Sequence, residues 1–150
     1  MPNWCNNKLV IEDCSIELEQ YLKAEGFSFE KMNPTPTHLL EDGWYDWRIS
    51  NWGTKWDLDE NEQREVAEGL ISDSTDFCAY FNTAWSPPCQ AIAALSEKFP
   101  NDSFILDYVE LGGWFAGTAH ISDGSISEEQ EEDVARFAQE VFDYELDEVD

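Results

Sequence analysis

Two short segments concentrate the side chains of this chain that could bind a small molecule. They read WGTKWD at residues 52–57 and TAWSPP at residues 83–88. Lys55 stands between two tryptophans, so its ammonium group could form a cation–π contact or an ion pair with a nearby carboxylate. Ligand pockets are typically apolar and aromatic, with a few polar groups that orient the ligand. The candidate pocket residues are Trp52, Lys55, Trp56, Asp57, Trp85, Ser86 and Glu110.

A packing role is the alternative interpretation of the same tryptophans, and it is the favoured one. Large aromatic side chains commonly anchor irregular loops, because each buries roughly 150 to 250 Å². In that case Trp52, Trp56 and Trp85 are largely buried near one another, with Lys55 joining the two loops. Truncation of Trp85 to alanine would then cost about 3 to 5 kcal/mol of folding free energy.

No pattern in the sequence predicts catalysis. A nucleophilic Ser86 would need a base, but His38 and His120 stand in no triad pattern, and helix capping already explains this serine. Asp57 and Glu110 could form a glycosidase pair, yet with 33 acidic residues some pair of carboxylates will always be available. We therefore expect no catalytic residue.

The cysteines give no sign of a metal site or a cofactor. Cys5, Cys14, Cys78 and Cys89 contain no CxxC pair and no short spacing. A zinc site would need four ligands that converge in space, and nothing local predicts such a cluster. Free thiols packed as small apolar groups are the favoured interpretation, with no metal and no cofactor.

The charge of the chain excludes several classes of partner. It carries 33 Asp and Glu against 8 Lys and Arg, a formal net charge of −25. Direct binding to nucleic acid or to anionic membranes would need clustered basic residues that the chain lacks. No apolar run reaches the roughly 20 residues of a membrane span, and the first residues lack the pattern of a signal peptide. A cytoplasmic location in the host cell is expected.

The C-terminal part of the chain is the most acidic. A capping box of Ser127 and Gln130, followed by apolar residues at helical spacing, predicts a helix over residues 127–146. If residues 128–150 were wholly helical, they would carry one acid per roughly 3 Å, close to the phosphate spacing of a DNA strand. Such a helix could mimic DNA locally, or it could be a solvated face that only keeps the protein soluble. The candidate partner-binding residues are Glu128, Glu129, Glu131, Glu132, Asp133, Glu140 and Asp143.

The elements that position these residues follow from periodicity and capping. The first half predicts a strand over 8–12, a helix from Ser15 to Gly26, a strand over 27–32, and a short helix within a Trp-rich insertion over 40–57. The second half predicts a hairpin with arms at 66–71 and 77–84 around a polar turn at 72–75. A helix capped by Ser86 and ended by Pro100 follows, and then a hairpin with arms at 103–111 and 114–121. Gly112 and Gly113 are expected to supply the positive φ of its turn.

These elements follow a βαββαβ-like order, extended by a Trp-rich insertion, an extra hairpin strand and the acidic C-terminal helix. Four stretches carry a more specific resemblance: residues 1–7, 52–57, 83–88 and 108–112. They resemble the YubB-like or Api-type ferredoxin-like domains of bacteriophages and conjugative plasmids. The resemblance covers about residues 1–122 and implies an α+β, ferredoxin-like sandwich for this core. It implies no iron–sulfur cluster and no catalytic residue. The length of the chain predicts a single domain over 1–150.

Together these observations predict a non-enzymatic accessory protein of a phage or plasmid. Its acidic surface would bind and inhibit a basic host protein, such as a nucleic-acid-handling or defence complex, in the manner of a DNA mimic. The alternative is a small enzyme or ligand-binding module that uses the Trp-lined loops.

Overall fold

A five-stranded antiparallel sheet forms the centre of the molecule. The structure is a computed structural model that describes residues 3–69 and 75–143. The strands lie in the order β2-β1-β3-β4-β5. They are β1 (Trp4–Ile11), β2 (Phe77–Ala84), β3 (Phe104–Glu110), β4 (Phe115–Ser122) and β5 (Ser125–Gln130).

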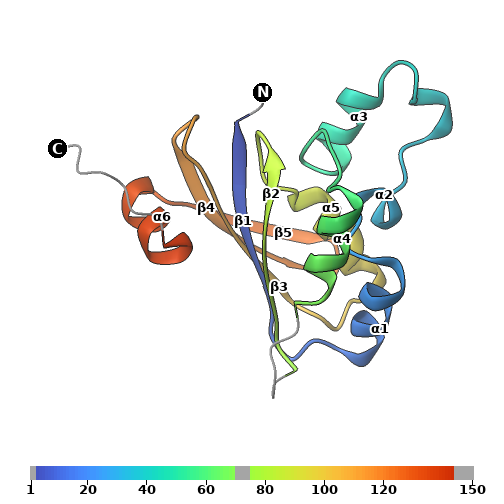
Figure 1. Ribbon diagram of the computed structural model, residues 1–150, viewed down its shortest axis with the longest axis horizontal. Coiled ribbons are helices and arrows are strands. Elements are labelled where there is room, and N and C mark those ends of the chain that lie inside the picture. Colours follow the sequence, from blue (N-terminus) through green and yellow to red (C-terminus); the bar gives the residue numbers. More distant parts are fainter. Residues whose placement is uncertain (1–2, 70–74, 144–150) are drawn as a thin grey trace.

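Helices cover the two faces of this sheet unequally (Figure 1). Among the described residues, one face carries α1 to α5 and the opposite face carries α6. The helices are α1 (Ile16–Glu25), α2 (Phe29–Met32), α3 (Trp44–Asn51), α4 (Glu60–Ala67), α5 (Cys89–Lys98) and α6 (Val134–Phe142), with a 3-10 turn at Thr37–Leu39. The predicted α+β class is therefore present.

The connections explain why β1 lies inside the sheet. Both β2 and β3 pair with β1 in antiparallel fashion, so β2 and β3 run in the same direction on either side of it. Two strands that run in the same direction need a crossover connection, and α5 supplies it. The result is a split β-α-β unit with β1 between its strands.

The main core lies between the sheet and the five helices. Alternation along the strands turns one set of side chains to this face, including Leu9, Phe77 and Leu106, and all of them are fully or almost fully buried. A smaller cluster on the opposite face joins Val109 of β3 to Val134 of α6. The sheet is thus packed on both faces only where α6 lies.

Two of the predicted strands, at 27–32 and 66–71, overlap helices instead. Residues 27–32 contain α2, because Ser28 caps it through the Lys31 N–H and Asp57 accepts hydrogen bonds from the first turn. The predicted arm at 66–71 belongs partly to α4, which Asp59 caps by accepting from the Glu62 N–H. Of the predicted turn at 72–75, residues 72–74 lie outside the described residues.

The predicted helix over 127–146 is also wrong in its first part. Asp123 and Gly124 have φ of 45° and 80° and turn the chain back along β4, so that residues 125–130 form β5. Pairing with β4 satisfies backbone groups that a helix would otherwise satisfy internally. The helix α6 begins only after Asp133, which caps it through the Arg136 N–H.

Two turn residues act differently from the prediction. Pro88, not Ser86, stands at the N-terminal cap of α5. In the turn between β3 and β4 the positive φ, 58°, belongs to Trp114 and not to the glycines. Gly112 instead lies close to the Asn3 side chain, which would have to move to admit a Cβ, since that atom would lie 2.5 Å from it.

Thiol labelling tests this packing. All four cysteines are free; three are buried and Cys78 is only partly buried. Burial raises the pKa of Cys14 to about 11 and, with the nearby Glu128 charge, that of Cys89 to about 12. Since the thiolate is the reactive form, a thiol reagent at pH 8 should modify Cys78 first in the folded protein. Mass spectrometry of digested protein, with urea-unfolded protein as the control, measures this order. Equal labelling of Cys89 and Cys78 would contradict the packing.

Candidate functional site

Four of the seven tryptophans lie at one end of the sheet and are exposed. The exposed fractions are 46% for Trp4, 41% for Trp56, 44% for Trp85 and 55% for Trp114. We call these four residues the tryptophan rim. Exposed tryptophans of this number are uncommon on a surface that only faces water, because each leaves a large apolar area unburied.

The strand register brings the rim together. Trp4 opens β1 and pairs with Ala84, the last residue of β2, so Trp85 follows directly beside it. The backbone N–H of Trp85 donates to the Asn3 carbonyl at 2.8 Å. Asn6 pairs with Val109, and this pairing carries the end of β3, and with it the turn that holds Trp114, to the same end of the sheet.

Hydrogen bonds attach the loop that contains Trp56 to this end. The Thr54 hydroxyl donates to the Ala84 carbonyl at 2.8 Å, and the Ser86 hydroxyl donates to the Gly53 carbonyl. Gly53 has φ of 91°, and a Cβ there would lie 2.6 Å from the Pro87 carbonyl oxygen, so only glycine fits. The two segments singled out in the sequence therefore form one unit.

Lys55 lies over the rings of the rim. Its Nζ is 4.3 Å from the ring centroid of Trp56 and 5.8 Å from that of Trp85. The Trp56 ring in turn contacts Trp4, with centroids 6.4 Å apart. The predicted cation–π contact is present, although its second ring belongs to Trp85 and not to Trp52.

Two rim residues adopt a backbone conformation that bulky side chains rarely take. Trp85 has φ of 68° and Trp114 has φ of 58°, whereas the three other described non-glycine residues with positive φ are aspartates. Left-handed backbone is costly for a large residue. Neither side chain is buried, so core packing does not offset this cost. Such conformations tend to persist at functional sites.

The other predicted pocket residues do not join the rim. Trp52 is fully buried, and its indole N–H donates to the Asn33 carbonyl at 2.8 Å. Glu110 is buried, and its carboxylate accepts from the Gly113 N–H in the turn before β4. Asp57 accepts from the backbone of Phe29, which places it in the cap of α2. These three residues therefore have structural contacts.

The predicted burial of the tryptophans is thus wrong for two of the three. Trp52 is buried as expected, but Trp56 and Trp85 are exposed. Sequence reasoning also missed Trp4 and Trp114 as members of the same surface. Both residues stand next to strand ends, which is the signal that the sequence offers. Only the strand register shows that these strand ends lie at the same end of the sheet.

A groove of about 300 Å³ lies beside Ser86, between the start of α5 and β5. The Tyr108 hydroxyl donates to a Glu128 carboxylate oxygen at 2.5 Å and accepts from the Gln130 amide at 3.0 Å. Burial, together with the hydrogen bond to Glu128, raises the pKa of Tyr108. These polar groups bond to one another across the sheet, so they serve to hold β5 in place.

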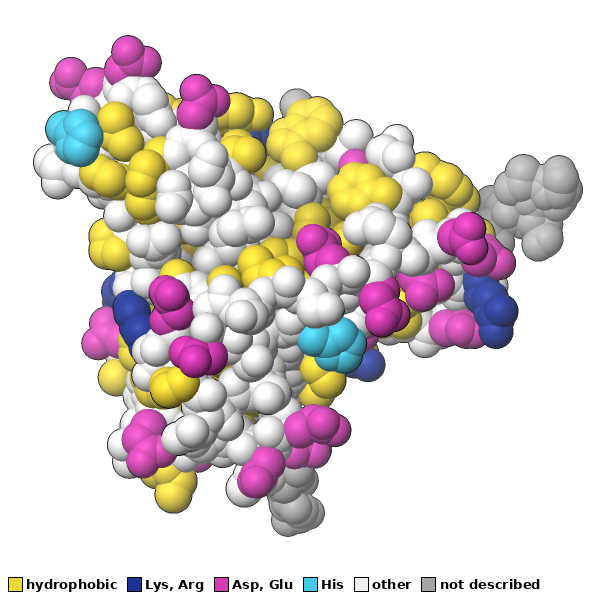
Figure 2. Space-filling view, turned by 180° about the vertical axis from the view of Figure 1, so that it is seen from behind, with side chains coloured by type: hydrophobic (Ala, Val, Ile, Leu, Met, Phe, Trp, Pro, Cys, Tyr) yellow, Lys and Arg dark blue, Asp and Glu magenta, His cyan; other side chains and the backbone are white. Residues whose placement is uncertain are grey.

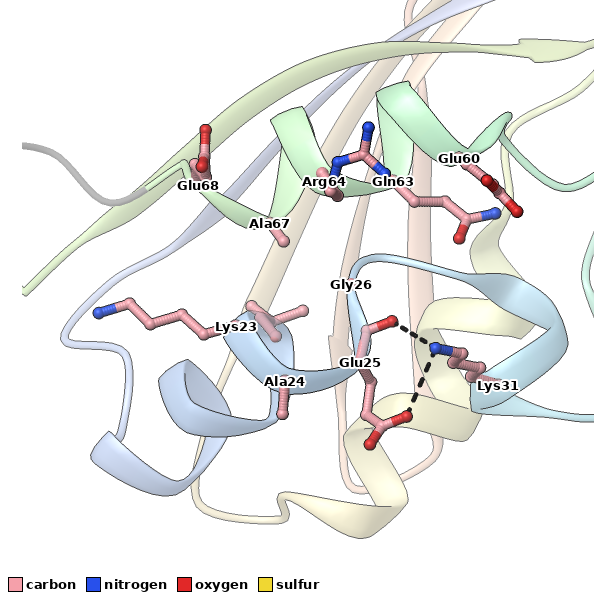
Figure 3. A pocket seen from close by; sticks show the side chains of 11 residues that line it. Lys23, Ala24, Glu25, Gly26, Lys31, Glu60, Gln63, Arg64, Ala67 and Glu68 are labelled. Atoms are coloured by element: carbon pink, nitrogen blue, oxygen red, sulfur yellow. Dashed lines mark hydrogen bonds and ion pairs between the residues drawn. The ribbon is translucent and has the colours of Figure 1, made fainter.

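Another hollow lies between α1, α2 and α4, and sequence reasoning did not find it (Figure 3). It measures about 460 Å³ and is lined by both acidic and basic residues, including Glu25, Lys31 and Arg64. Lys31 bonds back to Glu25, through both its carbonyl at 3.0 Å and its carboxylate at 3.5 Å. The nearest charges therefore neutralise each other, and this hollow carries no functional argument.

The seven predicted partner-binding acids are all exposed, but they do not form one helix face. Glu128 and Glu129 are neighbours on β5, so their side chains point to opposite faces of the sheet. Glu131, Glu132 and Asp133 connect β5 to α6, while Glu140 lies on α6 and Asp143 at its C-terminal cap. The helix α6 has nine residues and spans only about 14 Å. The predicted row of carboxylates along one long helix, on which the helical DNA mimic depended, is therefore wrong.

Acidic side chains are instead scattered over the surface. On the face shown in Figure 2 they lie over most elements, and basic side chains are few. Within residues 3–69 and 75–143, no group of three or more His, Cys, Asp or Glu could hold a metal ion. Over the same residues, no helix has the length and apolar character that crossing a membrane requires.

The comparisons with known proteins support the fold. A family model described as a ferredoxin-like domain in Api92-like protein matches residues 51–150. This match confirms the predicted fold class and the predicted Api-type family, and it includes three of the four motifs that carry the resemblance. It also extends beyond residue 122, over the acidic C-terminal part. No curated protein and no solved structure matches the chain.

Tryptophan truncation separates the core from the rim. Trp52→Ala should lower the free energy of unfolding by about 3 to 5 kcal/mol, because it removes a fully buried side chain. Trp114→Ala should cost about 1 kcal/mol or less, because that side chain is mostly exposed. Urea denaturation of both variants measures the difference. Equal losses would mean that the rim is part of the core.

Asp57 gives a second test of structural against functional roles. Its carboxylate accepts hydrogen bonds from the Ser28 hydroxyl and from the N–H groups of Phe29, Glu30 and Leu58. Asp57→Ala should therefore lower the free energy of unfolding by about 2 to 3 kcal/mol, and Asp57→Asn by less, since one carbonyl acceptor remains. Thermal denaturation checks both. An unchanged stability of Asp57→Ala would return this residue to the list of binding candidates.

Proposed function

The chain belongs to the family of ferredoxin-like domains in Api92-like proteins, and we propose that it is a non-enzymatic module that binds a basic protein. The description of the family names a fold and no reaction. The proposal therefore depends on the surface of this chain.

The tryptophan rim is the observation that carries the proposal. Tryptophan is among the residues that contribute most to protein–protein affinity, and such residues cluster at the centre of an interface. The rim places four exposed tryptophans at one end of the sheet. Two of them keep a strained backbone without being buried, which favours a role in binding over a role in stability.

Charge specifies the chemistry of the partner. The Glu131 N–H donates to the Ala116 carbonyl at 2.9 Å, and Ala116 is only two residues from Trp114. Glu131 is therefore attached close to the turn that holds Trp114, and Glu132 and Asp133 follow it in the chain. We call these three exposed acids the acidic link. A net charge of −25 would attract a basic protein over a long range and speed its association.

A nucleic-acid-handling or defence protein of a host cell is the kind of basic partner that the proposal favours. Such a protein carries basic surfaces that normally meet phosphates. The acidic link and the rim would cover that surface by charge and by apolar contact together, so no continuous row of carboxylates is needed. Inhibition of the partner would follow from this competition.

Affinity capture from bacterial lysate, followed by measurement of binding to the captured protein, tests the proposal. Trp4→Ala and a triple neutralisation of the acidic link (Glu131→Gln, Glu132→Gln, Asp133→Asn) should each weaken binding at least about tenfold. Wild-type binding should also weaken between about 50 and 500 mM salt, because screening removes the attraction.

A matched control keeps the change in net charge the same. Neutralising Glu60 and Glu65 on α4 and Glu68 at its C-terminal cap, which are also exposed, should leave the affinity nearly unchanged. If this control weakens binding as much as the acidic-link variant, the interaction is only a general charge effect. If Trp4→Ala binds like the wild type, or if no basic protein is captured, the proposal fails. A small molecule retained through the Trp-lined loops would favour the ligand-binding alternative.

A further inference from the structure

Two cations of this chain lie over tryptophan rings, and their surroundings differ. The Arg48 guanidinium lies 5.0 Å from the Trp44 centroid and 4.7 Å from the Trp52 centroid. It also donates to the Thr35 hydroxyl at 3.1 Å and is 3.7 Å from the Glu30 carboxylate. Arg48 is therefore held by several groups and joins α3 to the segment after α2.

Lys55 has no such attachments. Its ammonium forms neither a hydrogen bond nor a salt bridge with any residue of the described ranges, 3–69 and 75–143, although the chain carries 33 acidic residues. Its cation–π partners within the described ranges are the rings of Trp56 and Trp85. At a partly exposed site a cation–π contact contributes roughly 0.5 to 1 kcal/mol. Water and another cation can therefore compete with these rings for the ammonium.

The rings themselves are held more firmly than the lysine. Trp56 contacts the Trp4 ring, and the backbone of Trp85 is fixed by its hydrogen bond to Asn3. The two segments that carry these rings are joined by the Thr54 hydroxyl, which donates to Ala84, and by the Ser86 hydroxyl, which donates to Gly53. The rings would therefore keep their positions if Lys55 moved away, and the preorganised faces would remain available to a cation.

We propose that Trp56 and Trp85 form a cation-binding cage that Lys55 fills in the free protein, and that a Lys or Arg side chain of the basic partner displaces Lys55 on binding. The nature of the occupant rests on the proposed function, whereas the cage does not. The exchange replaces one cation–π contact by another, so its gain comes from the partner's accompanying contacts with the rim. Lys55 would then act as an internal competitor that disfavours partners without a suitably placed cation.

Tetramethylammonium is a probe that tests the cage without any partner. Lys55→Gln empties the cage and should bind this ion at least tenfold more tightly than the wild type does. The indole N–H signals of Trp56 and Trp85 in NMR spectra report the binding. Neopentyl alcohol, a neutral molecule of similar shape, should not bind detectably, because the attraction depends on the positive charge.

Lys8→Gln is the matched control. It removes one positive charge from another cation–π pair, since the Lys8 Nζ lies 5.8 Å from the centroid of the exposed Tyr80 ring. This variant should bind tetramethylammonium as weakly as the wild type. Adding Trp85→Ala to Lys55→Gln should abolish the gain, and adding Trp85→Phe, which keeps an aromatic ring, should retain part of it. Equal binding by the Lys55 and Lys8 variants, or equal binding of the neutral probe, would overturn the cage.

Affinity for the captured basic partner tests the occupant separately. Lys55→Gln should raise this affinity at least threefold relative to Lys8→Gln, because the internal competitor is gone. If Lys55→Gln binds tetramethylammonium but its affinity for the partner is unchanged or lower, the cage stands and the assignment of its occupant is wrong. If no basic partner is captured, the proposed function fails, while the result with tetramethylammonium still decides the cage.

Discussion

The register of β1 between β2 and β3 is the constraint on which the rest of the structure depends. Pairing of Trp4 with Ala84 and of Asn6 with Val109 decides which strand ends meet. A slip by one residue would turn Leu9 and Ile11 away from the core, so the register is strongly specified by burial. The same pairing that buries these residues also gathers the tryptophan rim, and the surface site is therefore a consequence of core packing.

Part of the acidity of this protein is structural, although the net charge of −25 invites a purely functional explanation. Asp57, Asp59 and Asp133 accept hydrogen bonds from the first turns of α2, α4 and α6. Asp102 accepts from both the backbone N–H and the hydroxyl of Ser15, the cap of α1. Carboxylates are favourable at helix N-termini, where N–H groups are unpaired and the helix dipole is positive. The carboxylates that remain without such partners are the ones available to another protein.

Stability and binding are divided between different tryptophans of the same segment. Trp52 fills the core, and its indole N–H is satisfied by a backbone carbonyl, whereas Trp56, four residues later, is exposed beside Lys55. The loop between them is held by backbone and hydroxyl contacts, not by the exposed rings. Changes to the rim are therefore expected to alter recognition with little effect on folding, which is the condition that makes the proposed surface open to mutational study.

Local signals in the sequence were enough to determine much of the fold. Ser15 and Gly26 cap the two ends of α1, as predicted. The alternation of side chains identified β2, and two apolar runs identified the hairpin of β3 and β4. These elements are decided by caps and periodicity within a few residues. The family resemblance was likewise carried by short motifs, and the match over residues 51–150 confirms it.

Tertiary structure alone decided the remaining features. Residues 29–32 became helical because Asp57, distant in sequence, completes the cap, and residues 125–130 became a strand because β4 offered a partner. The exposure of a tryptophan depends on whether a neighbouring element covers it, which composition does not encode. The candidate site followed the same rule: the sequence placed Lys55 among tryptophans, but only the meeting of β1 and β2 selected the rings that face it.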